Sequence, residues 1–155
     1  MSLRGRVMTA IIAGLVISAG VQAQEKKIKR SDLPPAVEKT VSEQSSGATV
    51  RGFSLEKEKG QTFYEAQLTV DGHSKDILID AKGTVVEVEE EVAMDRLSAE
   101  VKVGLLAKAG KGKIRKVETI KKQDKLVAYE AQVVTNGKKS EVQVGPDGKP
   151  LDHEE

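Results

Sequence analysis

The stretch YEAQLTVDG occupies residues 64–72, and nearly the same stretch, YEAQVVTNG, occupies residues 129–137. Setting residues 64–90 against 129–155 at a constant offset of 65 requires no gap. An ungapped match over this length indicates one structural unit that is written twice. The fold can therefore be worked out from either copy and checked against the other.

Each copy opens with a segment that is typical of an amphipathic helix. Apolar residues recur every four positions: Leu33, Val37 and Val41 in the first copy, and Leu97, Val101 and Leu105 in the second. This spacing places them on one face of a helix. Two prolines at residues 34–35 suit only a helix start, because proline lacks the amide donor that later turns need. We expect helices over residues 34–44 and 98–109.

Alternating strands and tight turns follow each predicted helix. In YEAQ the Tyr and Ala share one parity, whereas the Glu and Gln share the other, as in a strand with one buried face. Asp71-Gly72 and Asn136-Gly137 are preferred pairs for the type I′ turn of a hairpin. The sequence therefore predicts an α+β fold of two tandem repeats, residues 33–91 and 92–155. Each repeat packs one helix on a three- or four-stranded antiparallel meander sheet.

The first 23 residues, MSLRGRVMTAIIAGLVISAGVQA, are typical of a secretory signal peptide. The apolar run is shorter than the roughly 20 residues that a membrane-spanning helix needs, and glycines interrupt it. We predict cleavage before Gln24, a periplasmic or secreted location, and no transmembrane anchor after cleavage. Residues 24–32 are predicted to be a linker.

Composition excludes several classes of function. After removal of residues 1–23, the chain carries 23 basic and 24 acidic residues, so no excess of positive charge favours nucleic acid as a partner. There is no cysteine, so neither a disulfide nor a thiol nucleophile or metal ligand is available. Stability must come from packing and backbone pairing.

Short motifs in both copies resemble those of a known family. In the first copy they are Leu33-Pro34, Tyr64-Glu65-Ala66, Gly72, Asp80 and Gly83. They are similar to the PepSY-like, or beta-lactamase-inhibitor-like, family of exported bacterial proteins. The second copy departs from the pattern, with Ser98 and Gly145 in place of Pro34 and Asp80. The resemblance implies small helix-plus-sheet modules of the cell envelope, and related domains in thermolysin-like protease propeptides restrain the enzyme.

No catalytic motif or cofactor motif is found. The only histidines are His73, beside a predicted hairpin turn, and His153, near the last residue. Neither stands in a setting such as Gly-x-Ser-x-Gly, where a base could be held beside a nucleophile. AGKGKIRK at residues 109–116 lacks the Gly-Lys-Ser/Thr of a phosphate-binding loop. We expect no enzyme activity, no cofactor and no metal site.

One charged segment stands out as a candidate partner-binding surface. Residues 108–125 hold eight basic side chains, against the acidic Glu118 and Asp124. The predicted partner-binding residues are Lys111, Lys113, Arg115, Lys116, Glu130 and Gln132. Such a segment can steer a charged partner, or it can be an ordinary solvated strand that resists aggregation.

The predicted function is therefore that of an exported, non-enzymatic binding module. It binds, and in one version restrains, another envelope or secreted protein such as a hydrolase. The alternative is a small-ligand or cation-binding envelope protein that uses four neighbouring carboxylates, those of Glu87, Glu89, Glu90 and Glu91.

Overall fold

The structure is a computed structural model that describes residues 26–58 and 60–155. The predicted signal peptide lies outside the described residues, as do residues 24 and 25 of the predicted linker. The first strand, β1, spans Lys26–Ile28 and so lies within the predicted linker.

Two helices and eight strands make up the described part of the chain. Helix α1 spans Pro35–Gln44 and helix α2 spans Ala99–Ala109, close to the predicted ranges. Short 3₁₀ turns precede them at Arg30–Asp32 and Met94–Arg96. After β1, the strands are β2 (Thr49–Glu58), β3 (Gln61–Val70), β4 (His73–Asp80), β5 (Val85–Glu91), β6 (Lys113–Lys122), β7 (Lys125–Thr135) and β8 (Lys138–Val144).

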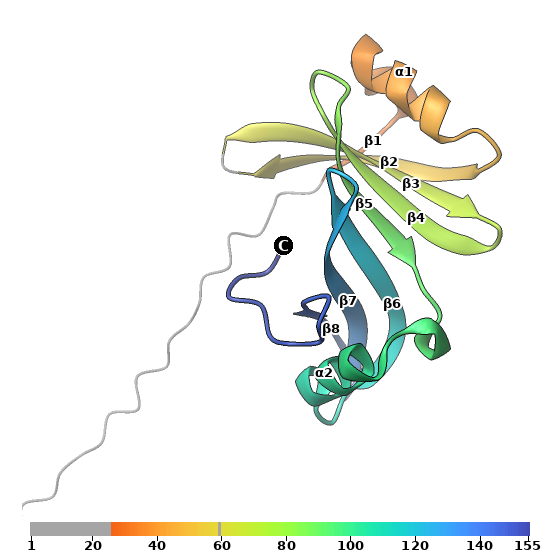
Figure 1. The fold of residues 1–155 in the computed structure, drawn as a ribbon. Helices are drawn as coiled ribbons and strands as arrows, with labels where there is room; N and C mark the ends of the chain where they lie inside the picture. The colour runs from red at the N-terminus through yellow and green to blue at the C-terminus, as the bar shows by residue number, and fades with distance from the viewer. Residues whose placement is uncertain (1–25, 59) are drawn as a thin grey trace, which may run out of the picture.

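All eight strands form one antiparallel sheet in chain order, β1 to β8 (Figure 1). The decisive contact is the pairing of β5 with β6, which runs from Glu87 opposite Lys122 to Glu91 opposite Glu118. The expectation of two tandem helix-on-meander repeats is therefore wrong, because the strands of both halves belong to one sheet. Two separate sheets would leave β5 and β6 as edges with unpaired backbone groups, and their pairing satisfies those groups. The α+β meander character is retained.

The helices pack on two apolar clusters of this sheet, as Figure 1 shows for α1 near β2–β4 and for α2 near β6–β8. The first cluster contains Leu33, Val37, Val41, Phe53, Ala66, Leu68, Ile77 and Ile79. The second contains Leu97, Val101, Leu105, Ala109, Val117, Ala131, Val133 and Val144. The two clusters lie on the same face of the sheet. Val88 of β5 packs on the first cluster and pairs with Lys121 of β6, and residues directly opposite each other point to the same face. Lys121 in turn shares its face with Val117 of the second cluster, because the two are four residues apart on one strand. Both helices thus cover the same face, and the other face is free of helices.

Glycines that recur at the offset of 65 have a packing role. At Gly83 (φ 88°) an added Cβ would lie 2.7 Å from the carbonyl oxygen of Ala36, and the hydroxyl of Thr40 donates to the Gly83 carbonyl at 2.6 Å. At Gly148 (φ 75°) an added Cβ would overlap the carbonyl of Glu100. In each half the helix therefore rests against a turn that tolerates only glycine.

The predicted type I′ turns are confirmed. Asp71 and Gly72 have φ of 50° and 86°, and Asn136 and Gly137 have φ of 52° and 80°. The β6–β7 turn is of the same positive-φ kind at Gln123 and Asp124. That pair lacks a glycine, which is why the sequence did not mark it.

Leu105→Ala tests the packing of α2. Leu105 is fully buried, whereas Val103 on the same helix is 67% exposed. We expect Leu105→Ala to lower the free energy of unfolding by about 2–5 kcal/mol, because it removes buried methyl groups and leaves a cavity. Val103→Ala should change it by about 0.5 kcal/mol or less. Urea denaturation of both variants measures the difference, and equally small effects would contradict the packing.

Candidate binding face

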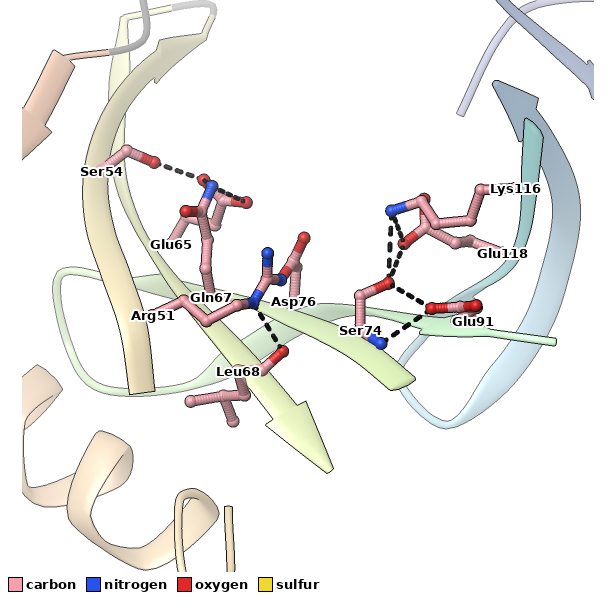
Figure 2. A network of polar contacts seen from close by, with 10 residues as sticks. All are labelled: Arg51, Ser54, Glu65, Gln67, Leu68, Ser74, Asp76, Glu91, Lys116 and Glu118. Atoms are coloured by element: carbon pink, nitrogen blue, oxygen red, sulfur yellow. Dashed lines mark hydrogen bonds and ion pairs between the residues drawn. The ribbon is translucent and has the colours of Figure 1, made fainter. Parts of the chain in front are cut away.

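The helix-free side of the sheet, which we term the polar face, is lined with carboxylates and amides. Side chains that are neighbours across the strands there include Ser54 and Glu65, Gln67 and Asp76, Asp76 and Glu89, Glu91 and Glu118, and Glu130 with both Glu118 and Gln143. Figure 2 shows several of them projecting from β2, β3, β4 and β6 toward the concave side of the curved sheet. Residues from the two halves of the sequence therefore meet on one surface.

In the first half, two polar groups hold carboxylates in place. The hydroxyl of Ser54 donates to Glu65. The guanidinium of Arg51 donates to Asp76 Oδ1 at 2.7 Å and to the carbonyl of Leu68 at 3.0 Å (Figure 2). The carboxylates of β3 and β4 are thus fixed by groups from β2.

At the junction of the halves, four residues from β4, β5 and β6 form a network (Figure 2). The ammonium of Lys116 lies 2.6 Å from Glu118 Oε1 and donates to Ser74 Oγ at 3.2 Å. The hydroxyl of Ser74 lies 3.0 Å from Glu118 Oε1, and its backbone N–H donates to Glu91 at 3.0 Å. The side chain of Glu118 is 3% exposed. Its charge is supported because a cation and a hydroxyl are both bonded to it.

In the second half, the C-terminal residues lie against the polar face. The backbone N–H of Glu155 donates to Gln143 Oε1 at 2.8 Å, and the amide of Gln143 donates to Glu130 Oε2 at 2.9 Å. The carboxylate of Glu155 also lies 3.1 Å from Lys122, which contacts Glu87 at 3.4 Å. The last residue of the chain is therefore held against side chains of β6 and β8.

Three carboxyls of this face have raised pKa values. Burial, with the negative charges of four neighbouring carboxylates, raises the pKa of Glu89 to about 9. Burial raises the pKa of Glu130 to about 7, although the hydrogen bond from Gln143 opposes the change. Burial, and then the charge of Glu65, raises the pKa of Asp76 to about 6 against the attraction of Arg51. At neutral pH Glu89 is therefore protonated.

A small pocket on the polar face contains Glu89. It is lined by Glu56, Glu65, Asp76, Leu78, Glu87 and Glu89, and its volume is about 80 Å³. Sites for drug-sized molecules and cofactors are about 300–1,000 Å³. The pocket therefore suits a single side-chain head or an ion.

Carboxylate oxygens of Asp76, Glu89 and Glu118 all lie within 4.8 Å of one another, so these three residues could contact a cation. Two of the three already contact a cationic side chain of the chain itself, Arg51 or Lys116. The four carboxylates of the cation-binding alternative do not stay together. Glu90 lies on the helix-covered face and pairs with Lys75 at 3.3 Å and Lys121 at 2.6 Å.

The predicted partner-binding residues are partly brought together. Lys116, Glu130 and Gln132 lie on the polar face, where Lys116 pairs with Gln132 across β6 and β7. Arg115 occupies the bulge beside them, and with Gln132 it lines an open groove that reaches β8. Lys113, at the start of β6, and Lys111, in the turn before it, are exposed at the rim of the sheet.

Glu89 was predicted only as part of the cation-binding alternative, and its grouping with Asp76 and Glu118 across the junction was not predicted. A signal was present, because Glu87, Glu89 and Glu91 alternate along one strand and must share a face. The pattern does not show which strand pairs with the one that carries these glutamates.

No protein-family model matches the chain, and no curated protein matches it. Solved structures with a similar fold do exist. One is a DUF2874 family protein from Bacteroides ovatus, with 20% identity and a TM-score of 0.58, covering 78% of this chain and 86% of that one. Another, from Bacteroides eggerthii and described as periplasmic, has 17% identity and a TM-score of 0.60 and covers 77% and 86%. A BLIP-like protein from Bacteroides fragilis has 19% identity and a TM-score of 0.54 and covers 77% and 83%.

At these identities the likeness concerns the fold. The predicted resemblance is confirmed at the level of a BLIP-like and DUF2874-like fold, and the comparisons support neither PepSY specifically nor two tandem copies. The periplasmic description of the Bacteroides eggerthii structure agrees with the expected periplasmic or secreted location. In the described part of the chain, neither helix has the length and apolar character needed to cross a membrane.

Stability should fall as pH rises, because of Glu89. Its pKa moves from 4.5 to about 9 on folding, so the folded chain binds the extra proton between these values. The contribution of this proton to the free energy of unfolding is complete below pH 4.5 and is lost as pH rises from there through 9. Glu89→Gln, which keeps a neutral side chain, should remove at least about 2 kcal/mol of the loss between pH 5 and 9.

The free energy of unfolding, measured by urea denaturation at several pH values, provides the test. Glu100→Gln, at an exposed carboxylate of α2, is the matched control and should keep the wild-type dependence. If Glu89→Gln follows the same pH curve as wild type, the carboxyl is not held neutral by the fold.

Proposed function

We propose that this chain is a non-enzymatic binding protein of the periplasm that engages another envelope protein through its polar face. The observation that carries the proposal is the continuous helix-free side of the sheet, where carboxylates from both halves gather without full neutralisation. Such a surface lowers the stability of the folded chain, because burial and mutual repulsion disfavour the charged forms of its carboxyl groups. A partner that supplies compensating charge offsets that cost.

The polar contacts support binding better than catalysis. Nδ1 of His73 lies 3.6 Å from Glu91, and the next residue, Ser74, donates its backbone N–H to Glu91 and its hydroxyl to Glu118. In a nucleophilic site the imidazole stands between the hydroxyl and the carboxylate. Here the carboxylate stands between them, so the imidazole is not placed to activate the serine.

The size of the pocket at Glu89 argues against a drug-sized ligand at that point of the face. The pocket at Glu89 holds about 80 Å³, whereas the polar face extends over strands β2 to β8. A stable protein interface takes about 800 Å² from each partner, which only an extended face supplies. The resemblance to beta-lactamase-inhibitor-like proteins makes an envelope hydrolase the first class of partner to test.

Gln132→Trp tests the use of the polar face. The indole would project from β7 into the proposed interface, where it should weaken binding at least about tenfold by steric exclusion. Lys108→Trp, on the exposed side of α2, adds the same group on the opposite side of the molecule and should have no effect. A partner captured from envelope extract by the mature chain is purified, and its dissociation constant is measured for each variant by surface plasmon resonance.

Both variants must first show the wild-type circular dichroism spectrum. Equal affinities of the two variants for the purified partner would place the interface away from the polar face. A weaker Lys108→Trp with an unchanged Gln132→Trp would place it on the helix side.

The predicted basic residues have a separate role in this proposal. Lys113 and Arg115 are exposed at the rim, where their charge acts at long range and changes the rate of encounter more than the strength of the final contact. Because these two cations repel a partner that brings positive charge to the polar face, the double reversal Lys113→Glu/Arg115→Glu should raise the association rate constant on the order of tenfold at low salt and leave dissociation nearly unchanged.

Stopped-flow or surface plasmon resonance at 20 and 200 mM salt measures these rate constants. The double reversal Lys82→Glu/Lys108→Glu, at exposed positions with the same change in net charge, is the control. If both doubles alter association alike, only net charge matters and the segment at the start of β6 has no steering role.

A further inference from the structure

Glu89 differs from the carboxylates around it. It makes no hydrogen bond and no ion pair with any residue that the structure describes, although its side chain is half-buried on strand β5, in the middle of the polar face. Each of three close neighbours has a cation of the chain's own: Arg51 for Asp76, Lys116 for Glu118 and Lys122 for Glu87. Among the described residues, Glu89 is therefore left without the polar partner that these three neighbours have.

Free space lies beside this unpaired carboxyl. The pocket of about 80 Å³ is walled by Glu56, Glu65, Asp76 and Glu87, and apart from these acidic groups it contains the apolar side chain of Leu78. Carboxylates on several sides can accept hydrogen bonds from an ammonium or guanidinium head. The alkyl stem of such a side chain can in turn contact Leu78.

We propose that the partner inserts one lysine or arginine side chain of an exposed basic segment into this pocket, where it pairs with Glu89. The inference rests on the proposed function, since it names the chemistry of the partner at the same polar face. Glu89 then gains the counter-charge that each of its three neighbours already has.

Charge decides between a side-chain cation and a divalent metal ion. Calcium takes six to eight oxygen ligands, and cationic side chains nearby repel it. Asp76 and Glu118, whose carboxylate oxygens lie within 4.8 Å of Glu89, are contacted by Arg51 at 2.7 Å and by Lys116 at 2.6 Å. A divalent ion bound by all three carboxylates would compete with both cations, whereas a single ammonium group can pair with Glu89 alone.

A segment of protein chain also fits the surroundings of the pocket. On the adjoining part of the face, the backbone N–H of Glu155 donates to Gln143, which in turn bonds to Glu130. Side-chain amides there thus bind a peptide backbone in the molecule itself. A basic segment of the partner can lie along the neighbouring strands in the same manner.

Binding of this kind is coupled to protons. Burial and the charges of Glu130, Glu87, Glu118 and Asp76 raise the pKa of Glu89 to about 9, so the carboxyl is protonated at pH 7.5. The charged groups that face it are Glu56, Arg51, Glu65, Asp76, Glu87, Glu118, Lys116, Lys122 and Glu130, from strands β2 to β7. An inserted ammonium lowers the pKa, so the proton leaves Glu89 for the solvent. Contact with carboxylates that are already ionised releases none.

The test uses hexalysine as the probe on the mature chain, residues 24–155. Isothermal titration calorimetry at pH 7.5, in buffers with different ionisation enthalpies, counts the protons released on binding. We expect about one proton per bound peptide and an affinity that rises between pH 6 and 9. In Glu89→Gln the proton release should disappear and the affinity should fall about tenfold. Glu100→Gln, outside the polar face, should behave as wild type.

Two results would overturn the proposal. One is hexalysine binding with equal affinity and no proton release in wild type and Glu89→Gln, which would mean that lysines meet only ionised surface carboxylates. The other is proton release on titration with calcium chloride but not with hexalysine, which would make the pocket a metal site.

The captured partner separates this inference from the proposed function. If Gln132→Trp weakens the partner but Glu89→Gln does not, the polar face binds without an inserted cation and only the inference fails. If neither variant weakens it, the proposed function of the face fails as well. Loss of affinity in both variants, with Lys108→Trp and Glu100→Gln unaffected, supports both.

Discussion

The backbone pairing of β5 with β6 is the constraint on which the rest of the structure depends. It converts two short meanders into one sheet and satisfies backbone groups that would otherwise lie at two exposed edges. It also fixes the register in which Glu87 meets Lys122 and Glu91 meets Glu118. Both helices cover the same side of this sheet because strand parity is continuous through the junction, and the opposite side is left for polar groups.

The same pairing concentrates acidic side chains. Every second residue of β5 from Glu87 to Glu91 is a glutamate whose side chain lies on the polar face. Strands β4, β6 and β7 each add further carboxylates to this face. Part of this charge is balanced inside the molecule: Lys116 forms an ion pair with Glu118, and the hydroxyl of Ser74 donates a hydrogen bond to it. Glu89 is not balanced and keeps its proton instead. A fold that maintains this arrangement forgoes stability at neutral pH, which is typical of surfaces shaped by binding.

Much of the local structure could be predicted, because it follows from short-range physics. Four-residue spacing of apolar side chains located both helices, and Asp-Gly and Asn-Gly located two type I′ turns. The β6–β7 turn at Gln123-Asp124 was missed because its positive φ values have no glycine to mark them. Of the candidate site, Lys116, Glu130 and Gln132 were grouped on one predicted surface because of the basic segment beside them, whereas Asp76 and Glu89 were not associated with them.

The sequence by itself determined both helices, most of the strands and their order, since these depend on dihedral preferences and periodicity within a few residues, but it did not mark β1. Only the tertiary structure decided which strands are neighbours at the junction. Backbone N–H and C=O groups are nearly the same at every residue, so they do not show in the sequence that β5 pairs with β6. For that reason the acidic polar face, which exists only once the two halves are paired, could not be assembled from the sequence.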